Sequence, residues 1–533
     1  MLKRWKRALQ SCLLCGVGLN PAITLASTTS SNQVQIYPST NALPLSADFQ
    51  VKVRVPGQAW QDVPVYGVPV TTGLDIDSRV KRTTGADIAS SNRGSSQFDR
   101  LLTSMTSFDF SGQVEIAVTS THSVPRSVKI RPSAEQIVPT QKDRTLYFSL
   151  SSPKNLSIEL DGDTAHNLQL FASKLEDGRP SPSDPNVIYY GPGVHTVGQI
   201  SIPSEKTVYL AGGSVVIGSF VMDHVHDVKI LGRGILAQRS NTTIPLPADP
   251  QGASPRRGAS TERHDAIRIA FSSNVLVEGI IEVPSSYTVL VGQSEGVTLR
   301  DLKSFSAGGN NDGIDIFTSK HVLIDGVFLR NSDDCIAIYG HRWNYYGDTT
   351  DVTVRNSTLW ADVAHPILVG THGDSEHPDT LSQLRFENID ILEHREPQID
   401  YQGCMSLNAG DDNLIKDVLF ENIRVDDFQM GQLLNLRVFY NRKYNTSPGR
   451  GIQDVVFRNV TYRGSHANPS IIAGYDETRT IRNVTFENLT INGVLVSDDM
   501  PGKPGFYKTG DIARIFVGEH VEGVVFRSVP STH

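Results

Sequence analysis

The stretch Leu384-Arg385-Phe386-Glu387-Asn388-Ile389 is one copy of a short phrase that recurs through the second half of the chain. In a typical copy, two or three alternating apolar residues precede a small or polar residue, and one more residue, usually apolar, follows it. Such alternation is typical of β-strands. Other copies are Val275–Ile280, Val322–Val327, Val352–Ser357, Val418–Ile423, Val455–Val460 and Val484–Leu489.

The spacing of the copies indicates how they are arranged. Asn356, Asn388 and Asn422 hold the same place in three copies and are 32 and 34 residues apart. No helical periodicity fills the intervals, and such a repeat is typical of a β-solenoid, whose coils bury their apolar faces against one another. We expect the Asn residues to form the bend between two strands and to stack into a side-chain ladder. The repeat therefore predicts a parallel β-helix over residues 186–530.

A different pattern occupies the first third of the chain. From Val34 to Ala172, short alternating runs such as Val51–Val55 and Val114–Val118 are separated by turn residues at intervals typical of a β-sandwich. The pattern stops at the proline-rich stretch Arg179–Pro185, which indicates a domain junction. We predict an all-β protein with an N-terminal β-sandwich at 30–180, followed by a right-handed parallel β-helix. The sandwich could bind glycan or cap the first coil.

The first residues resemble a secretory signal peptide. Met1–Arg7 is basic, Ala8–Leu19 is largely apolar, and Thr24-Leu25-Ala26 ends in a small residue, so we predict cleavage near Ala26 and a secreted or periplasmic protein. The apolar run is too short to span a bilayer, and no later segment is apolar for long enough. We expect no membrane association after cleavage.

Composition limits the possible partners. The chain has 533 residues and a net charge of −8, so it offers no basic surface for nucleic acid. It contains no cluster of Cys and His with zinc-ligand spacing, and we expect neither a metal nor another cofactor. A polysaccharide is the expected partner. A capped solenoid needs no second subunit, so we expect a monomer.

Two acidic motifs lie about one coil apart. Asn310-Asn311-Asp312-Gly313 and Asn331-Ser332-Asp333-Asp334 place Asp312 and Asp333 21 residues apart, so both can stack on neighbouring coils. Crowded carboxylates repel one another, which raises the pKa of one while the others stay ionised, and glycosidic hydrolysis needs such an acid and base. Each motif alone would be a turn or a solvated pair. Asp333 and Asp334 can both face a cleft only if the strand bends between them.

These motifs resemble those of a clan of right-handed parallel β-helix glycoside hydrolases, which contains family 28, the polygalacturonases, and family 49, the dextranases and isopullulanases. Asn310-x-Asp312-Gly313 is similar to the Asn-Thr-Asp block of family 28, and Asp333-Asp334 to its Asp-Asp block. Ala364–Gly373 is similar to the Gly-His-Gly block and the segment that trails it. The resemblance covers most of 190–530, and a sandwich ahead of the helix is similar to family 49.

The resemblance implies a role for each motif. Asp333 would be the general acid that protonates the leaving oxygen, and Asp312 and Asp334 would act on the attacking water as general base. His365 would tune the acid or position a sugar hydroxyl. A base that acts through water implies inversion at the anomeric carbon.

The substrate expectation rests on one departure from family 28. The Arg-Ile-Lys block that binds the uronate carboxylate in that family corresponds here to Gly403–Asn408, which contains neither cation. We therefore expect a neutral α-glucan such as dextran, cleaved internally. The alternatives are a polygalacturonase-like pectin hydrolase, a polysaccharide lyase and a non-catalytic glycan-binding protein.

Further substrate-binding residues are expected around these motifs. Trp343 and Tyr346 lie in the insertion His341–Asp348, and their rings could stack on sugars or pack the loop. Trp360 is expected to be buried. The other candidates for substrate binding are Asn310, His372 and Tyr401, with Arg437 and Tyr440 as further cleft candidates. Asp315 can turn outward, and Asp411-Asp412 has the composition of a plain turn.

Overall fold

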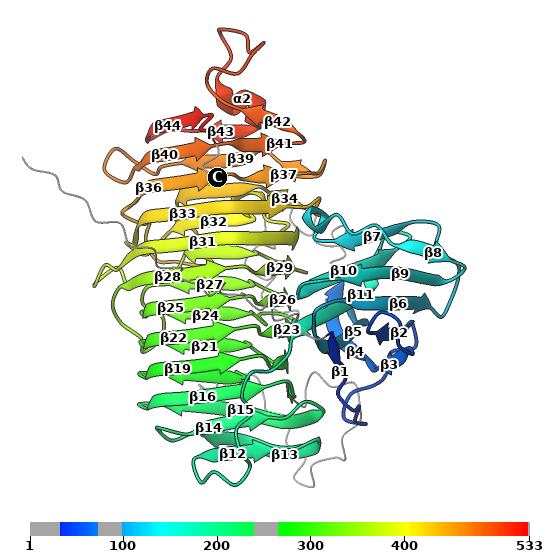
Figure 1. Cartoon of the computed structure of the whole chain (residues 1–533). Coiled ribbons are helices and arrows are strands. Elements are labelled where there is room, and N and C mark those ends of the chain that lie inside the picture. Colours follow the sequence, from blue (N-terminus) through cyan, green and yellow to red (C-terminus); the bar gives the residue numbers. More distant parts are fainter. Residues whose placement is uncertain (1–31, 73–98, 239–264, 531–533) are drawn as a thin grey trace, which may run out of the picture. The chain divides into compact units, whose positions relative to one another are not determined.

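The computed structural model describes residues 32–72, 99–238 and 265–530, and these fold almost entirely into strands (Figure 1). The predicted all-β class, with N-terminal sheets followed by a parallel β-helix, is confirmed. The predicted signal peptide lies outside the described residues. No helix in these ranges is long and apolar enough to cross a membrane.

Two sheets form the N-terminal part, and their pairings are antiparallel except for that of β11 with β5. Phe108, Ile116, Leu156 and Leu168 belong to the apolar core of these strands. The first sheet contains β1 (Gln33–Gln35), β4 (Val65–Thr72), β5 (Asp99–Ser111), β7 (Val128–Arg131), β10 (Lys154–Leu160) and β11 (Asp163–Lys174). The second contains β2 (Phe49–Arg54), β3 (Gln61–Val63), β6 (Val114–Ser120), β8 (Thr140–Lys142) and β9 (Thr145–Leu150). A 3₁₀ turn, η1, covers Ser133–Glu135.

The β-helix begins at β12 and ends at β44, and its 31 strands form three faces joined by bends. The site face contains β18 (Ile267–Ala270), β21 (Val289–Gly292), β24 (Ile314–Phe317), β27 (Ile336–Tyr339), β30 (Ile367–Gly370), β32 (Met405–Ala409), β35 (Leu434–Val438), β39 (Ser470–Ala473) and β43 (Ile515–Val517). The ladder face contains β12 (Val187–Tyr190), β14 (Thr207–Leu210), β16 (His226–Gly232), β19 (Ser273–Glu278), β22 (Glu295–Arg300), β25 (Lys320–Asp325), β28 (Thr349–Arg355), β31 (Thr380–Glu393), β33 (Leu414–Val425), β36 (Gly451–Arg458), β40 (Ile481–Glu487) and β44 (Val521–Arg527). The sandwich-side face contains β17 (Ile235–Ala237), β20 (Ile281–Val283), β23 (Lys303–Phe305), β26 (Phe328–Asn331), β29 (Thr358–Ala361), β37 (Thr461–Tyr462) and β41 (Leu489–Ile491).

The remaining elements extend or connect these faces. β15 and the long strands β31 and β33 continue from one face to the next. The helix strands run parallel, apart from β42, which is antiparallel to β41. These further elements are β13 (Gly193–Ser201), β15 (Ser214–Asp223), β34 (Gly431–Gln432), β38 (Ala467–Asn468), β42 (Val494–Val496), the 3₁₀ turn η3 (Ile399–Tyr401) and the short helix α2 (Thr509–Ala513).

The first sheet packs against the sandwich-side face through a shared apolar cluster. Val68 and Phe171 from the sheet meet Phe305, Phe328 and Trp360 from the β-helix. Trp360 is 1 % exposed, which confirms its predicted burial. The sandwich is therefore joined to the coils by a continuous core.

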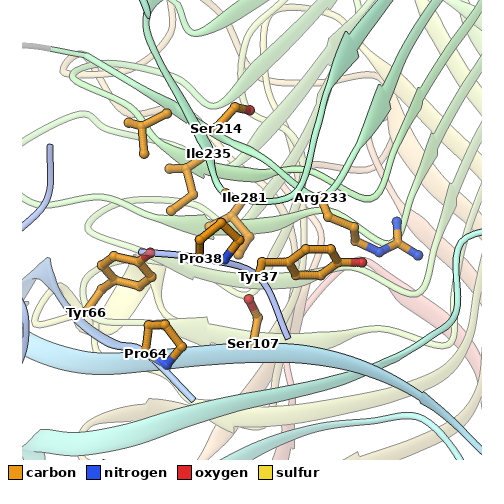
Figure 2. A pocket seen from close by; sticks show the side chains of 11 residues that line it. Tyr37, Pro38, Pro64, Tyr66, Ser107, Ser214, Arg233, Ile235 and Ile281 are labelled. Atoms are coloured by element: carbon orange, nitrogen blue, oxygen red, sulfur yellow. The ribbon is translucent and has the colours of Figure 1, made fainter. Parts of the chain in front are cut away.

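A short segment between β1 and β2 covers the first coils. Tyr37 and Pro38 pass over Gly212 and Gly213, where an added Cβ would come within 2.0 Å of the Tyr37 ring and 2.7 Å of Pro38. Figure 2 shows the cavity of about 20 Å³ that Tyr37 and Pro38 help to line with Arg233. This volume has room for a water molecule and not for a sugar.

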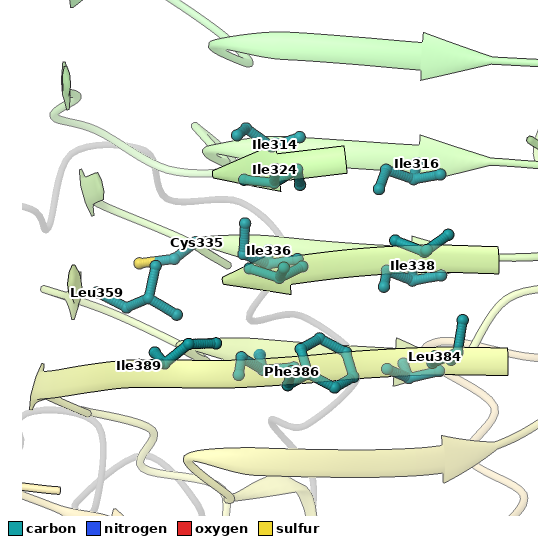
Figure 3. Packing of buried hydrophobic residues seen from close by; sticks show 14 of the residues in the cluster. Ile314, Ile316, Ile324, Cys335, Ile336, Ile338, Leu359, Leu384, Phe386 and Ile389 are labelled. Atoms are coloured by element: carbon teal, nitrogen blue, oxygen red, sulfur yellow. The ribbon is translucent and has the colours of Figure 1, made fainter. Parts of the chain in front are cut away.

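The apolar positions of the repeated phrase fill the interior of the coils, as Figure 3 shows for Ile324, Leu384 and Phe386. Phenylalanines from successive coils stack there with ring centroids 4.6–5.0 Å apart. The stacked rings are those of Phe386, Phe420, Phe457, Phe486 and Phe526. Because each coil buries the apolar residues of the phrase against the neighbouring coils, repetition of the phrase specifies the fold.

The Asn residues of the phrase form the predicted bends and ladder. Asn356, Asn388 and Asn422 have φ angles of 53–55°, in the left-handed region that Asn tolerates. Asn388 Nδ2 donates to Asn356 Oδ1 at 2.8 Å, and Asn459 bonds to Asn422 in the same way at 2.9 Å. The ladder is interrupted above Asn388, whose Oδ1 accepts from Arg424 at 2.8 Å instead.

Candidate active site

The two acidic motifs occupy bends that precede neighbouring strands of the site face. Asp312 lies two residues before β24, and Asp333-Asp334 lies between β26 and β27. Residues Ile314 and Ile336 are opposite each other in the pairing of β24 with β27. The bend required for Asp333 and Asp334 to face the same way is therefore present.

Gly313 brings the two bends into contact. Its N–H donates to the Asp334 carbonyl oxygen at 2.8 Å. A Cβ on Gly313 would lie 2.3 Å from the Cys335 carbonyl oxygen, so a larger residue would force the coils apart. The glycine after Asp312 thus holds the carboxylates close together.

Asp333 is half-buried at the centre of the site. Its Oδ2 accepts from the Asn310 N–H at 3.1 Å, and its Oδ1 accepts from the Asp334 N–H at 3.2 Å. Burial and the negative charges of Asp334 and Glu396 raise the pKa of Asp333 to about 7, although His365 acts in the opposite direction. Asp333 can therefore carry a proton near neutral pH, as a general acid must.

Asp334 and His365 form a buried pair. The Asp334 carboxylate accepts from the His365 backbone N–H at 3.0 Å and from Nδ1 at 2.7 Å. His365 is fully buried, and its Nε2 donates to the Tyr401 carbonyl oxygen. Both partners can only accept, so both ring nitrogens carry protons and the ring is cationic. Burial lowers the pKa of His365, but Asp334 and Glu396 outweigh it and the net shift is upward.

Asp312 is held by polar groups that lie inside the coil. It is 6 % exposed, and its carbonyl oxygen accepts from the Thr288 N–H at 3.0 Å. The Ser306 hydroxyl donates to the Asn311 carbonyl oxygen at 2.8 Å, and Asn331 Nδ2 donates to the same hydroxyl at 3.0 Å. This network holds both bends in place from the coil interior, which preorganises the carboxylates.

Two further acids accompany these residues. Asp315 points away from the coil interior, as its neighbours Ile314 and Ile316 are in the core, yet it is fully buried rather than turned to solvent. Glu396 is 4 % exposed and follows β31 in a loop that the sequence did not single out. It stands outside the repeated phrase, so no periodic signal marked it.

A pocket of about 330 Å³ opens among loops of the β-helix, and none of Asp312, Asp333 and Asp334 lines it. Its lining includes Trp343 and His372, two of the predicted substrate-binding residues. Trp343 is 39 % exposed, and its ring meets Phe317 edge-on at 5.2 Å. Burial and the nearby Arg342 lower the pKa of His372 to about 3, so this ring is neutral. Tyr346 is 56 % exposed and is not a lining residue, but its ring packs against His341, which is one.

Positive charge predominates among the lining residues. Arg342, Arg442 and Lys443 carry positive charge, whereas Asp411 is the single acid in the lining. Asp411 Oδ1 already accepts from the Thr446 N–H and hydroxyl at 2.6 and 2.8 Å. Asp411 does lie in a turn, as predicted, and it also anchors the loop that carries two of the cations.

The other predicted residues lie around this centre. Asn310 is exposed beside Asp333. Tyr401 is 6 % exposed and its ring meets that of His365 edge-on, with ring centroids 4.8 Å apart, so it contacts protein rather than open space. Arg437 lies opposite Asn408 in the pairing of β32 with β35, one coil beyond Gly403–Asn408, which contains no cation.

Comparisons with known proteins agree with this architecture. The family model described as glycosyl hydrolases family 28 matches residues 220–500. A polygalacturonase of Juniperus ashei is 26 % identical over 207 residues, which is 37 % of this chain and 37 % of that protein. A probable endo-xylogalacturonan hydrolase A of Neosartorya fischeri is 25 % identical over 235 residues, 43 % of this chain and 52 % of that protein. The chain thus spans about two fifths to one half of these relatives.

A solved structure has the same fold over most of the chain. Dex49A from Penicillium minioluteum superposes with a TM-score of 0.59 and 14 % identity, covering 92 % of this chain and 96 % of that one. The match extends beyond the β-helix and so includes the N-terminal sheets.

Proposed function

Because the chain belongs to glycosyl hydrolases family 28, whose model matches more than half of it, we propose that it hydrolyses an α-linked polysaccharide with inversion. The observation that carries this proposal is the crowding of Asp312, Asp333 and Asp334 at one point of the site face. Among them, Asp333 is the acid whose pKa rises to about 7. Separation of neighbouring pKa values is how an enzyme obtains a proton donor and a base from like groups.

A base that acts through water implies a single-displacement reaction. Asp333 donates its proton to the glycosidic oxygen as the bond from that oxygen to the anomeric carbon breaks. A water molecule attacks the anomeric carbon from the opposite face and gives its proton to Asp312 or Asp334. His365 orients Asp334 through its Nδ1 bond of 2.7 Å.

The lining of the pocket supports an acidic glycan as the substrate. The sequence alone favoured a neutral α-glucan because Gly403–Asn408 lacks cations. Arg342, Arg442 and Lys443 supply positive charge from other loops, and guanidinium groups suit sugar carboxylates. The names of the two relatives, a polygalacturonase and a probable endo-xylogalacturonan hydrolase, agree with a uronate-bearing chain.

A neutral α-glucan is the second candidate. On β32 the side chains that point away from the coil interior are Ser406 and Asn408, since Met405, Leu407 and Ala409 belong to the core. Neither carries charge, which is the observation that favours this candidate.

The test compares the purified chain with its Asp333→Asn variant on polygalacturonate, dextran and pullulan, recording reducing ends and the absorbance of unsaturated sugars. We expect reducing ends from polygalacturonate that the variant does not release. Asp325→Asn, on the ladder face, is the control and should remain active. Release from dextran alone would replace the acidic substrate by the neutral one. Unsaturated products, or full activity of Asp333→Asn, would overturn the proposed mechanism.

Three expectations from the sequence remain proposals. They are cleavage of the leader near Ala26 with action outside the cytoplasm, division into domains at 30–180 and 186–530, and a monomeric state. Mass spectrometry of the secreted protein, limited proteolysis and light scattering test them in turn.

A further inference from the structure

The loop 394–402 encloses His365. The His394 ring lies 5.9 Å from that of His365, the Tyr401 ring lies 4.8 Å from it, and the Tyr401 carbonyl oxygen accepts its Nε2 proton. His394 Nδ1 donates to the Ala364 carbonyl oxygen at 2.8 Å, while its Nε2 accepts from the Gly403 N–H at 2.9 Å. These hydrogen bonds attach the loop to Ala364, which precedes His365, and to Gly403.

Glu396 is the buried acid of this loop, and the proposed reaction does not use it. Its Oε1 accepts from the Gln398 backbone N–H at 2.7 Å and from Gln398 Nε2 at 3.1 Å. Gln398 also donates to the Tyr444 hydroxyl at 2.8 Å, and Lys443 Nζ donates to that hydroxyl at 2.7 Å. Tyr444 and Lys443 line the cationic pocket, so hydrogen bonds join Glu396 to its rim.

A second negative charge near His365 would help to keep Asp333 protonated, in addition to burial and Asp334. His365 is cationic, Asp334 balances it, and a further negative charge makes the site unfavourable for ionised Asp333. The groups that interact with this cluster are Asp312, Asp315, Tyr339, His394, Glu396, Tyr401, Lys443 and Tyr444.

Three of these groups are uncharged near neutral pH. Burial, together with His365, lowers the pKa of His394 to about 3. Burial raises the pKa of Tyr339 and of Tyr401 well above the usual range. Burial raises the pKa of Glu396, and the net shift is upward although His365, Gln398 and Lys443 act in the opposite direction. Those three groups are what favour its ionised form.

We propose that Glu396 is a positioning residue that keeps His365 cationic and Asp333 protonated by supplying a second buried negative charge. The inference rests on the proposed function, because it assumes that Asp333 is the general acid. It adds a requirement to that function, since the acid then depends on a loop outside the repeated phrase.

Three variants separate charge from shape. Glu396→Gln keeps the size of the side chain and removes its charge, whereas Glu396→Asp keeps the charge and shortens the side chain. Glu393→Gln is the matched control, because Glu393 is 2 % exposed and accepts from the Gln429 and His394 N–H groups while interacting with Arg131 of the sandwich.

The first readout is the pH profile of kcat/KM. Glu396→Gln should move the alkaline limb to lower pH by about 1 unit, the size expected for loss of a nearby like charge. Glu396→Asp should move it less, and Glu393→Gln should leave it in place. An unmoved limb in Glu396→Gln, or a larger shift in Glu396→Asp than in Glu396→Gln, would overturn the inference.

The second readout does not need activity. The NMR titration of the His365 ring, identified by its absence in His365→Asn, should have a lower midpoint in Glu396→Gln than in the wild type. An equal midpoint would contradict the inference even if Asp333→Asn is inactive. Full activity of Asp333→Asn with a lowered His365 midpoint would instead overturn the proposed function and leave the charge effect of Glu396 in place.

Discussion

The sandwich-side face and the site face of the same coils bury acids in different ways. On the sandwich side two buried acids each have their own arginine, since Arg330 Nε lies 3.1 Å from Asp362 and Arg233 Nε lies 2.9 Å from Asp109, whereas Glu282 of β20 is buried with no hydrogen-bond partner for its carboxylate among the described residues. On the site face Asp333, Asp334 and Glu396 all interact with one cation, His365. A paired buried acid maintains the fold, whereas acids that share a counter-ion are poised to exchange a proton.

A raised pKa alone does not separate the two faces. Burial raises the pKa of Glu393 to about 7 even though Arg131 opposes the shift, and Glu393 lies toward the sandwich. What distinguishes Asp333 is that its carboxyl group is only half-buried, in a bend, and beside a second carboxylate. The candidate site is therefore distinguished by neighbouring carboxylates that solvent can reach, and not by a raised pKa alone.

The sharpest test of this contrast is Asp333→Asn. We expect kcat to fall by about 10²–10⁴-fold, the usual contribution of a general acid. Stability should not fall, because the substitution removes repulsion with Asp334. Initial rates and urea unfolding of the same preparation measure both effects, and a large loss of stability would place Asp333 with the structural acids.

The reverse result is expected on the sandwich side. Asp362→Asn leaves the buried guanidinium of Arg330 without its counter-ion, which costs about 3–5 kcal/mol of unfolding free energy. Asp325→Asn, which breaks the half-exposed pair with Arg355 on the ladder face, should cost about 0–1 kcal/mol. Urea unfolding of both variants checks this order, and equal costs would remove the distinction between the faces.

The two faces should also differ in their response to pH. The pKa of Asp333 is higher in the folded protein than in the unfolded chain, so the folded state binds more protons between about pH 4 and 7. The stability that Asp333 contributes is therefore complete below pH 4 and is lost as the pH rises through about 7. Asp333→Asn should flatten the stability profile in this window. A profile that is equally steep in the variant would contradict the shift.

The smallest effect is expected at the cationic pocket. Arg442→Gln removes one of three positive charges and should raise KM for an acidic glycan by about 3–10-fold with little change in kcat, as rim charges contribute about 1 kcal/mol. Dextran or another neutral glucan should show no such change. Lower activity on both classes of glycan would indicate a structural role for Arg442.

The sequence predicted those features that depend on local pattern. Asn356 and Asn388 marked bends because Asn tolerates positive φ, and the spacing of Asp312 and Asp333 matched one coil. Glu396 and the pocket cations carried no such signal, since their positions depend on how loops fold back over the site face.

The same reason applies to the substrate expectation, which depended on where loops place positive charge. By order along the chain, the cations that bind a uronate carboxylate would be expected at Gly403–Asn408, which corresponds to the Arg-Ile-Lys block of family 28. In the structure they come from Arg342 and from the loop that Asp411 anchors, which are brought together only by long-range contacts. Tyr401 likewise gave no sign in the sequence that it would be buried behind His365.

The most direct test of the central claim is a proton NMR time course of the first sugar released from polygalacturonate by the wild type and by Asp333→Asn. Inversion at an α-linkage with Asp333 as the acid predicts that the β-anomer appears first in the wild type and that the variant releases none. An α-anomer formed first, or equal release by the variant, would contradict the account.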